Sequence, residues 1–371
     1  MLALPLALTS ISRFQNQPLV EWFVTSVVLA QPCDGIPMAR KPTLKDVALA
    51  AGVSEMTASR ALRNAADVSD RTREKVARAS AELGYVPNRI AGALASRSVN
   101  LIGVVVPSLS SFVFPEVLSG ISSGLSGSDL QPVIGVSGYD LLAEEKVIRE
   151  MLSWRPRGLI VAGLEHSEAA QKMLKAADIP IVEVMDVDGE PIDYCVGISH
   201  LKAGRLMAEA ILAKGYRKIG FIGTKMPFDF RAQKRLQGFK DGLAQQGVEL
   251  TAQKHYDGSS SIAKGRELTA VLLKQAPEID CIYYSSDVMS IGGLMHCLAE
   301  NLSVPGDLAL AGFNSLDQLD GLPIKLATTN AFRQEIGRKA AEIILDATPK
   351  EAQARDKKFI FVPEVDLGAS L

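Results

Sequence analysis

Residues 43–62 read TLKDVALAAGVSEMTASRAL, and this spacing predicts two short helices joined by a tight turn. In the first helix the small and apolar residues share one face: Leu44, Val47, Ala48 and Ala51. Thr43 is a good N-cap ahead of that helix, and Gly52 ends it as a C′ glycine should. Ser54 is placed to cap the second helix. Two short helices around a glycine-containing turn form a DNA-binding arrangement, with the second helix in the major groove.

The second helix predicts the DNA contacts. Arg60 has a planar fork that fits the O6 and N7 acceptors of guanine, Glu55 accepts from a cytosine amino group, and Met56 suits a thymine methyl. Thr57 and Ser59 are better placed for phosphates, which position the protein without specifying a sequence. The predicted DNA-contacting residues of this segment are Thr43, Ser54, Glu55, Met56, Thr57, Ser59 and Arg60. The alternative is an ordinary solvated helix face.

The distribution of charge supports the DNA-binding interpretation over that alternative. The formal net charge of the whole chain is −2, but residues 38–99 alone carry +5 and the residues that follow carry −6. A small basic module therefore precedes a large acidic body, which suggests that the module meets a polyanion and the body does not. A third helix is predicted over 69–83, before Gly84. We assign residues 38–86 to a helix-turn-helix domain and residues 87–99 to a hinge helix and linker.

The stretch TLKDVALAAGVSEMTASRALRN…VSDRTREKVARASAELGYVPNRIAGALAS resembles the DNA-binding headpiece of the lactose/galactose-repressor (LacI/GalR) family. The resemblance implies that NRIAGALAS (88–96) is a hinge helix that pairs with its twin across a dimer. It also implies that Leu94 enters the minor groove at the operator centre, with Asn88 and Ala91 beside it. Such an apolar wedge bends the duplex. The alternative for Leu94 is an ordinary core leucine.

After Ser98 the chain alternates between short apolar runs and amphipathic helical stretches. The runs are LIGVVV (101–106), PVIGV (132–136), GLIVA (158–162), IPIVEV (179–184), KIGFIG (218–223), CIYY (281–284) and LALAGF (308–313). This pattern predicts an α/β core with two doubly wound parallel sheets, and hence a ligand cleft at the carboxyl ends of their strands. Residues 100–365 resemble the type I periplasmic-binding-protein-like core of the same family, which implies chain crossings between the halves near 197–200, 320–328 and 348–356.

Polar and aromatic residues near strand ends are the candidate effector contacts: Phe112, Phe114, His166, Lys225, Arg231, Arg235, Asp287 and Asn314. The family resemblance places Arg235 and Asp287 at ligand positions, although many relatives carry aspartate where this chain has Asn314. A guanidinium binds a carboxylate or vicinal hydroxyls bidentately, and Lys225 and Arg231 add positive charge for an acid sugar. For each candidate the alternative is a surface loop residue. The headpiece, GLEHS (163–167) and FRAQKRLQGF (230–239) together resemble the gluconate-utilisation repressors.

These observations predict a DNA-binding transcriptional repressor that acts as a homodimer, without a cofactor or a metal. Its expected partners are a pseudo-palindromic double-stranded DNA operator and a small carbohydrate effector, namely gluconate or a related sugar acid. The effector could be an inducer or a corepressor, because the same headpiece, hinge and core would serve either role. Another sugar or a nucleoside is the alternative effector. The four cysteines are far apart, which argues against a disulfide scaffold and fits a reducing compartment. For a DNA-binding regulator we expect a cytoplasmic, nucleoid-associated location.

Residues 1–37 differ in character from the rest, with four prolines and no sustained periodicity. We interpret them as a disordered extension or the product of an upstream start codon, and expect no membrane anchor because no apolar run reaches about 20 residues. One rival interpretation is an exported solute-binding protein, which would leave residues 43–98 unexplained and lacks a basic signal sequence. The other rival is an enzyme on a doubly wound fold, but no nucleophile–base pairing, metal cluster, P-loop or dinucleotide fingerprint is present.

Overall fold

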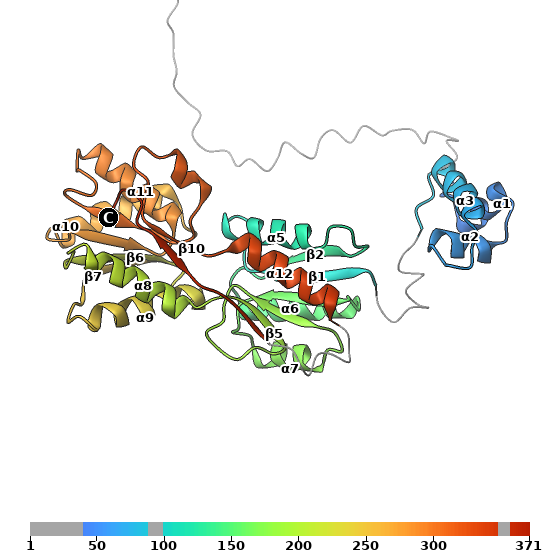
Figure 1. Cartoon of the computed structure of the whole chain (residues 1–371), viewed down its shortest axis with the longest axis horizontal. Helices are drawn as coiled ribbons and strands as arrows, with labels where there is room; N and C mark the ends of the chain where they lie inside the picture. Colours follow the sequence, from blue (N-terminus) through green and yellow to red (C-terminus); the bar gives the residue numbers. More distant parts are fainter. Residues whose placement is uncertain (1–39, 88–98, 348–356) are drawn as a thin grey trace, which may run out of the picture. The chain divides into compact units, whose positions relative to one another are not determined.

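The described residues fall into two compact units, one within Met1–Asn88 and the other within Arg89–Leu371 (Figure 1). The computed structural model describes residues 40–87, 99–347 and 357–371. The described part of the first unit, residues 40–87, is called the headpiece here, and that of the second unit is called the core. Within these described ranges, no helix is both long and apolar enough to span a bilayer.

The headpiece consists of three helices, and their bounds agree with the sequence prediction: α1 (Leu44–Ala51), α2 (Glu55–Leu62) and α3 (Asp70–Leu83). Thr43 caps α1, and the Asp46 side chain accepts the Thr43 backbone N–H at 2.8 Å. Gly52 ends α1 at φ 68°, in the left-handed region that glycine enters without strain. Val47, Ala58 and Val76 are fully buried where the three helices meet.

The core has two lobes. The first, called the N-lobe, is built on a six-stranded, wholly parallel sheet in the order β11-β5-β4-β3-β1-β2. Its strands are β1 (Leu101–Val106), β2 (Gln131–Val136), β3 (Gly158–Ala162), β4 (Ile181–Val184), β5 (Tyr194–Ile198) and β11 (Lys358–Phe361). Its helices are α5 (Val113–Gly124), α6 (Leu141–Ser153), α7 (Glu168–Ala176) and α12 (Arg333–Asp346). β1, β3 and β4 are almost completely buried because helices cover both faces of the sheet.

The second lobe, called the C-lobe, repeats this architecture on a four-stranded parallel sheet in the order β7-β6-β8-β9. Its strands are β6 (Ile219–Thr224), β7 (Leu250–Tyr256), β8 (Cys281–Tyr284) and β9 (Ala309–Ala311). Its helices are α8 (His200–Ala213), α9 (Phe230–Ala244), α10 (Ile262–Gln275), α11 (Asp287–Ala299) and the 3₁₀ helix η1 (Asp317–Gly321). A two-stranded antiparallel ribbon of β10 (Thr328–Asn330) and β12 (Glu364–Asp366) completes the core. The predicted fold class is confirmed.

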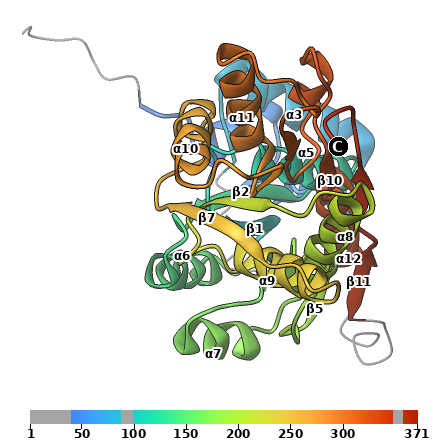
Figure 2. The same ribbon diagram turned by 90° about the vertical axis from the view of Figure 1, so that its left-hand side faces the viewer.

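The first crossing between the lobes is where the sequence places it, between β5 and α8. The other two expected positions were wrong. Leu319 and Leu326 still pack in the C-lobe interior, and the chain crosses only between β10 and α12. Residues 348–356 lie outside the described residues, but β11 after them still pairs with β5 in the N-lobe, so the last crossing lies between β11 and β12. The C-terminal segment therefore serves both lobes (Figures 1 and 2).

Candidate functional site

The exposed face of α2 is the one that the helix pattern predicts. Ser54 accepts the Thr57 backbone N–H at 3.1 Å and so begins the helix, while Ala58 and Ala61 are buried against α1 and α3. Glu55, Met56 and Arg60 are exposed and Ser59 is half-buried, with 72% of Met56 accessible. Thr43 and Ser54 serve as helix caps, and their contacts with DNA remain predictions. Asn88, Ala91 and Leu94 lie outside the described residues.

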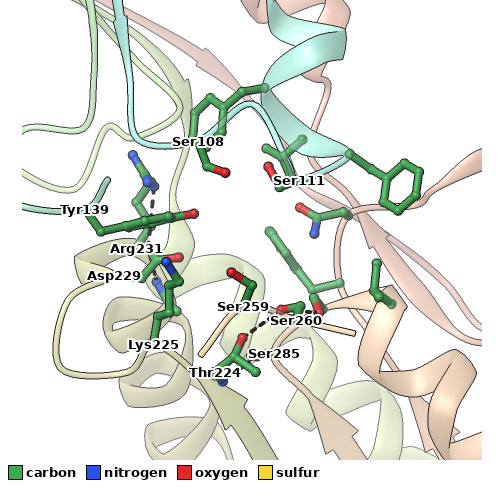
Figure 3. A pocket seen from close by; sticks show the side chains of 18 of the residues that line it. Ser108, Ser111, Tyr139, Thr224, Lys225, Asp229, Arg231, Ser259, Ser260 and Ser285 are labelled. Atoms are coloured by element: carbon green, nitrogen blue, oxygen red, sulfur yellow. Dashed lines mark hydrogen bonds and ion pairs between the residues drawn. The ribbon is translucent and has the colours of Figure 1, made fainter. Parts of the chain in front are cut away.

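A cavity of about 130 Å³ lies between the two lobes of the core (Figure 3). Its walls are the segments that follow β1, β2 and β4 in the N-lobe and β6, β7, β8 and β9 in the C-lobe. All of these are carboxyl ends of parallel strands, where doubly wound sheets bind ligands. Six of the eight candidate effector contacts line this cavity: Phe112, Phe114, Lys225, Arg231, Arg235 and Asn314.

The position of Arg235 depends on a close crossing of α8 and α9. A Cβ atom on Gly204 would lie 2.0 Å from the Arg235 carbonyl oxygen, and one on Gly238 would lie 2.0 Å from the Leu201 carbonyl oxygen. Only glycine at these two positions allows the backbones to approach so closely. The crossing brings His200, the first residue of α8, against Arg235 on α9.

Arg235 is a buried cation whose orientation is fixed by its neighbours. Its Nη1 donates to Nδ1 of His200 at 3.1 Å, its Nη2 donates to the Ser285 carbonyl at 3.3 Å, and its guanidinium lies 3.9 Å from the centre of the Phe313 ring. Because His200 Nε2 lies 2.6 Å from the Met185 carbonyl, Nε2 carries the proton and Nδ1 accepts. Burial and the adjacent Arg235 charge lower the pKa of His200 well below its ordinary value, so the imidazole is neutral. The buried Arg235 Nε has no protein partner.

The cavity has an excess of positive charge. Lys225, Arg231 and Arg235 line it, whereas Asp229 is its one carboxylate among the described residues. Burial by itself would raise the pKa of Asp229, but Arg231 and Arg235 outweigh this and hold the pKa below its usual range. Arg231 Nε lies 3.7 Å from the Asp229 carboxylate, and Lys225 Nζ lies 4.5 Å from the centre of the Tyr139 ring. Figure 3 shows Lys225, Asp229 and Arg231 on one side of the cavity, next to Tyr139.

Hydroxyl groups make up much of the rest of the wall. Seven serines line the cavity: Ser108, Ser110, Ser111, Ser259, Ser260, Ser285 and Ser286. The sequence analysis did not single them out, and it also missed Tyr139, His200 and Asp229. The available signal was position, because Ser108, Ser110 and Ser111 follow the apolar run that forms β1, and Ser285 and Ser286 follow the apolar run that forms β8. Together the wall offers cations and many small hydrogen-bonding groups, which suits an anionic polyhydroxylated ligand.

Asp287 does not line the cavity, contrary to the expectation from the family resemblance. Its carboxylate is fully buried and accepts the Thr328 hydroxyl at 2.7 Å and the Leu316 backbone N–H at 2.9 Å. Burial raises the pKa of Asp287 to about 6 despite these hydrogen bonds. Because each carboxylate oxygen accepts one of these hydrogen bonds, the structure assigns Asp287 to the support of the loop after β9. Asn314 in the same loop does line the cavity.

His166 does not line the cavity either. It is buried in the N-lobe between two carboxylates, with Nδ1 2.6 Å from Glu144 and Nε2 3.1 Å from Glu183. Burial alone would lower the pKa of His166, but the two carboxylates outweigh that effect and raise it to about 9. The imidazolium is therefore a structural cation that joins the loop after β3 to α6 and β4.

We expect this triad to make the stability of the core depend on pH. A raised folded-state pKa means that the stabilisation is complete below the ordinary value of 6.5 and is lost as the pH rises through about 9. The melting temperature of the wild type should therefore decrease as the pH is raised from 6.5 to about 9. His166→Gln should be less stable than the wild type at neutral pH, and its melting temperature should change much less over this pH range. Thermal unfolding at a series of pH values checks this. His296→Gln in α11 is the matched control, and a pH dependence unchanged in His166→Gln would contradict the assignment.

An ion-pair cluster, called the interlobe clasp here, joins the lobes beside the cavity. Lys234 of α9 in the C-lobe approaches Asp186 and Glu165 of the N-lobe, with Nζ 2.5 Å and 2.7 Å from the respective carboxylates. It also donates to the Asp188 carbonyl at 3.1 Å. The Asp186 side chain is fully buried. The clasp thus holds the arrangement of lobes that encloses the cavity.

A helix-turn-helix headpiece followed by a two-lobed core with a ligand cavity defines a ligand-responsive DNA-binding regulator of transcription. Residues 43–88 match the family of "Bacterial regulatory proteins, lacI family", and residues 100–363 match "Periplasmic binding proteins and sugar binding domain of LacI family". The chain belongs to the LacI family.

Individual relatives agree with this assignment. The chain is 39% identical over 310 residues to the HTH-type transcriptional regulator GntR of Pseudomonas aeruginosa. This match covers 82% of this chain and 89% of that protein. A crystal structure of a LacI-family transcriptional regulator from Silicibacter pomeroyi matches with a TM-score of 0.84 at 55% identity, covering 89% of this chain and 99% of that chain. The lac repressor dimer bound to operator shares the fold, with a TM-score of 0.77 at 24% identity, covering 89% of this chain and 99% of that chain. The first two of these relatives are named as transcriptional regulators, and the third is named as a repressor.

Proposed function

We propose that this protein is a homodimeric repressor that binds a pseudo-palindromic operator and whose affinity for that operator is set by gluconate or a related sugar acid. The observation that carries the effector class is the cavity wall, in which three cations face one carboxylate among seven serines. A neutral sugar leaves this positive charge without a partner, whereas a sugar acid supplies both a carboxylate and hydroxyls. The sequence resemblance to gluconate-utilisation repressors supports the same class.

The coupling between cavity and DNA follows from the two lobes. A ligand that contacts both lobes favours the arrangement that encloses it, and it shifts the protein only by its differential affinity for the two arrangements. Such coupling is typically about 1–3 kcal/mol per effector. We propose that the shift is passed to the hinge segment around Leu94 and so changes operator affinity. In this proposal the protein acts on chromosomal DNA in the cytoplasm.

Two measurements with the full chain test the proposal. The first selects binding sites from random duplexes at physiological salt, and we expect enrichment of a palindromic sequence. The second measures the melting temperature with gluconate, idonate, glucose and a nucleoside, since a specific ligand raises apparent stability by mass action. We expect a sugar acid to raise the melting temperature and to change operator affinity, in either direction. A rise with glucose or the nucleoside alone would contradict the effector class.

Arg60→Ala tests the DNA-binding face separately from the cavity. The guanidinium fork discriminates guanine by about 1–3 kcal/mol when it contacts O6 and N7 together. We therefore expect Arg60→Ala to lose selectivity at one base pair of each half-site while the other positions keep theirs. Site selection with the variant and the wild type gives the two preferences directly. Identical preferences would exclude a base contact by this side chain.

A further inference from the structure

Arg60 on α2 is paired, within the headpiece, with a carboxylate from outside its own helix. Arg60 Nε donates to Asp67 Oδ1 at 3.2 Å, and Nη2 lies 2.5 Å from Asp67 Oδ2. These are two parallel bonds between one edge of the guanidinium and both carboxylate oxygens. Asp67 belongs to the loop between α2 and α3, and both side chains are about half exposed.

The loop that carries Asp67 is itself anchored. Arg73 of α3 donates through Nη2 to the carbonyls of Ala65 and Val68, at 3.3 Å and 3.1 Å. These two residues flank Asp67 in the sequence, and Val68 is buried in the headpiece interior. The position of the Asp67 carboxylate is therefore set by the packing of the headpiece, before any DNA is bound.

The pairing leaves part of the guanidinium free. A guanidinium has five N–H donors, and the side-on contact with Asp67 uses one on Nε and one on Nη2. Of the remaining three, one on Nη1 and one on Nη2 point side by side from the end of the fork. Two parallel donors at that end match the O6 and N7 acceptors of a guanine. Asp67 and a guanine can therefore hold Arg60 at the same time, because they use different edges.

We propose that Asp67 is a positioning residue for sequence readout, which orients the Arg60 fork toward a guanine without touching the base. This inference rests on the proposed DNA binding. An arginine fixed in advance loses less side-chain freedom on binding and tolerates fewer alternative acceptors. Asp67 thus contributes to the choice of base, while its negative charge opposes the general attraction for DNA.

The test uses the full chain and a palindromic duplex selected by the wild type. A second duplex carries a substitution at the base pair whose preference is lost in Arg60→Ala. Fluorescence anisotropy gives the affinity for each duplex, and the affinity for the selected duplex divided by that for the substituted duplex is the discrimination ratio. For Asp67→Ala we expect this ratio to fall by about fivefold, the lower end of what a bidentate arginine–guanine contact supplies. Affinity for random duplex should not fall, since a negative charge has been removed. In Asp67→Asn, one neutral oxygen remains to accept, and we expect an intermediate ratio.

Two further variants decide the interpretation. Glu74→Ala removes an exposed negative charge from α3 without touching Arg60, and it should leave the ratio unchanged. In an Arg60→Ala background, Asp67→Ala should change nothing further, because the residue acts through Arg60. The inference is overturned if Asp67→Ala keeps the wild-type ratio, or if it raises affinity for the operator more than affinity for random duplex, which would mean that Asp67 restrains Arg60 from reading the base. A wild type that prefers no duplex would instead refute the proposed function.

Discussion

Replacing Arg235 by alanine should abolish the response to effector while operator binding persists. The guanidinium is buried at the cavity wall, and Nη1 and Nη2 each keep one N–H beyond their bonds to His200 and Ser285, so donors remain for a ligand carboxylate or hydroxyl. Hydrogen bonds to a charged group contribute about 1.5–3 kcal/mol each, so losing two of them should weaken effector binding by about 100-fold or more. Calorimetry with the sugar acid identified by thermal shift measures the affinity, and anisotropy measures operator binding with and without it.

The controls for this variant separate charge from geometry. Arg235→Lys keeps a positive charge but has no fork, and a bidentate site should not accept it as equivalent. Arg205→Ala removes an exposed arginine from α8, outside the cavity, and should leave the effector affinity unchanged. Normal induction or corepression in Arg235→Ala would show that the residue is not a ligand contact. Loss of operator binding together with the effector response would instead indicate a folding defect, which circular dichroism would detect.

Lys234→Met should destabilise the core through the interlobe clasp. Methionine keeps most of the apolar stem, but Asp186 then stays buried without its ammonium partner. Removing one member of a buried ion pair costs about 3–5 kcal/mol, and the partial exposure of Lys234 places the expected loss near the lower end. Effector affinity should fall as well, since a smaller fraction of the protein holds the arrangement that encloses the cavity. Urea unfolding and calorimetry give both quantities.

A second substitution distinguishes the clasp from a general effect of losing lysine. Lys234→Met with Asp186→Asn removes the unpaired charge, so it should recover part of the lost stability. Lys264→Met breaks the exposed pair with Glu267 in α10 and should leave the free energy of unfolding nearly unchanged. The preference among different sugar acids should be the same in Lys234→Met as in the wild type, because Lys234 does not line the cavity. An altered preference would show that the clasp residue contacts the ligand.

Sequence patterns predict best those elements whose ends are set locally. Each headpiece helix has its own cap, and two end at a glycine, so the predicted bounds agree with the structure to within a residue. In the core, apolar runs predict the central strands, but β7 reads LTAQKHY and β12 reads EVD. These strands lie at edges and are partly polar, so periodicity does not distinguish them from loops.

The same distinction applies to the candidate site, where some residues could be predicted from the sequence and others depend on contacts between distant segments. Arg235 could be found because it follows β6 in a motif that resembles the family, and the cavity does include it. Asp287 holds a comparable position after β8, but a loop from elsewhere in the chain occupies its carboxylate. His200 could not be found, because its contact with Arg235 exists only where α8 and α9 cross at Gly204 and Gly238. Such relations between distant segments require the folded structure.

The return of the chain to the N-lobe affects how the protein emerges during synthesis. α12 packs against α5 so closely that a Cβ atom on Gly120 would lie 2.1 Å from the Gln334 carbonyl oxygen, and β11 covers the edge of β5. During translation the headpiece is complete early, whereas the N-lobe is completed only by α12 and β11, which are translated more than 130 residues after β5. Until then, an unpaired strand edge and the apolar face of α5 are open to non-native association. We therefore expect the nascent chain to be prone to non-native contacts until α12 and β11 have been translated.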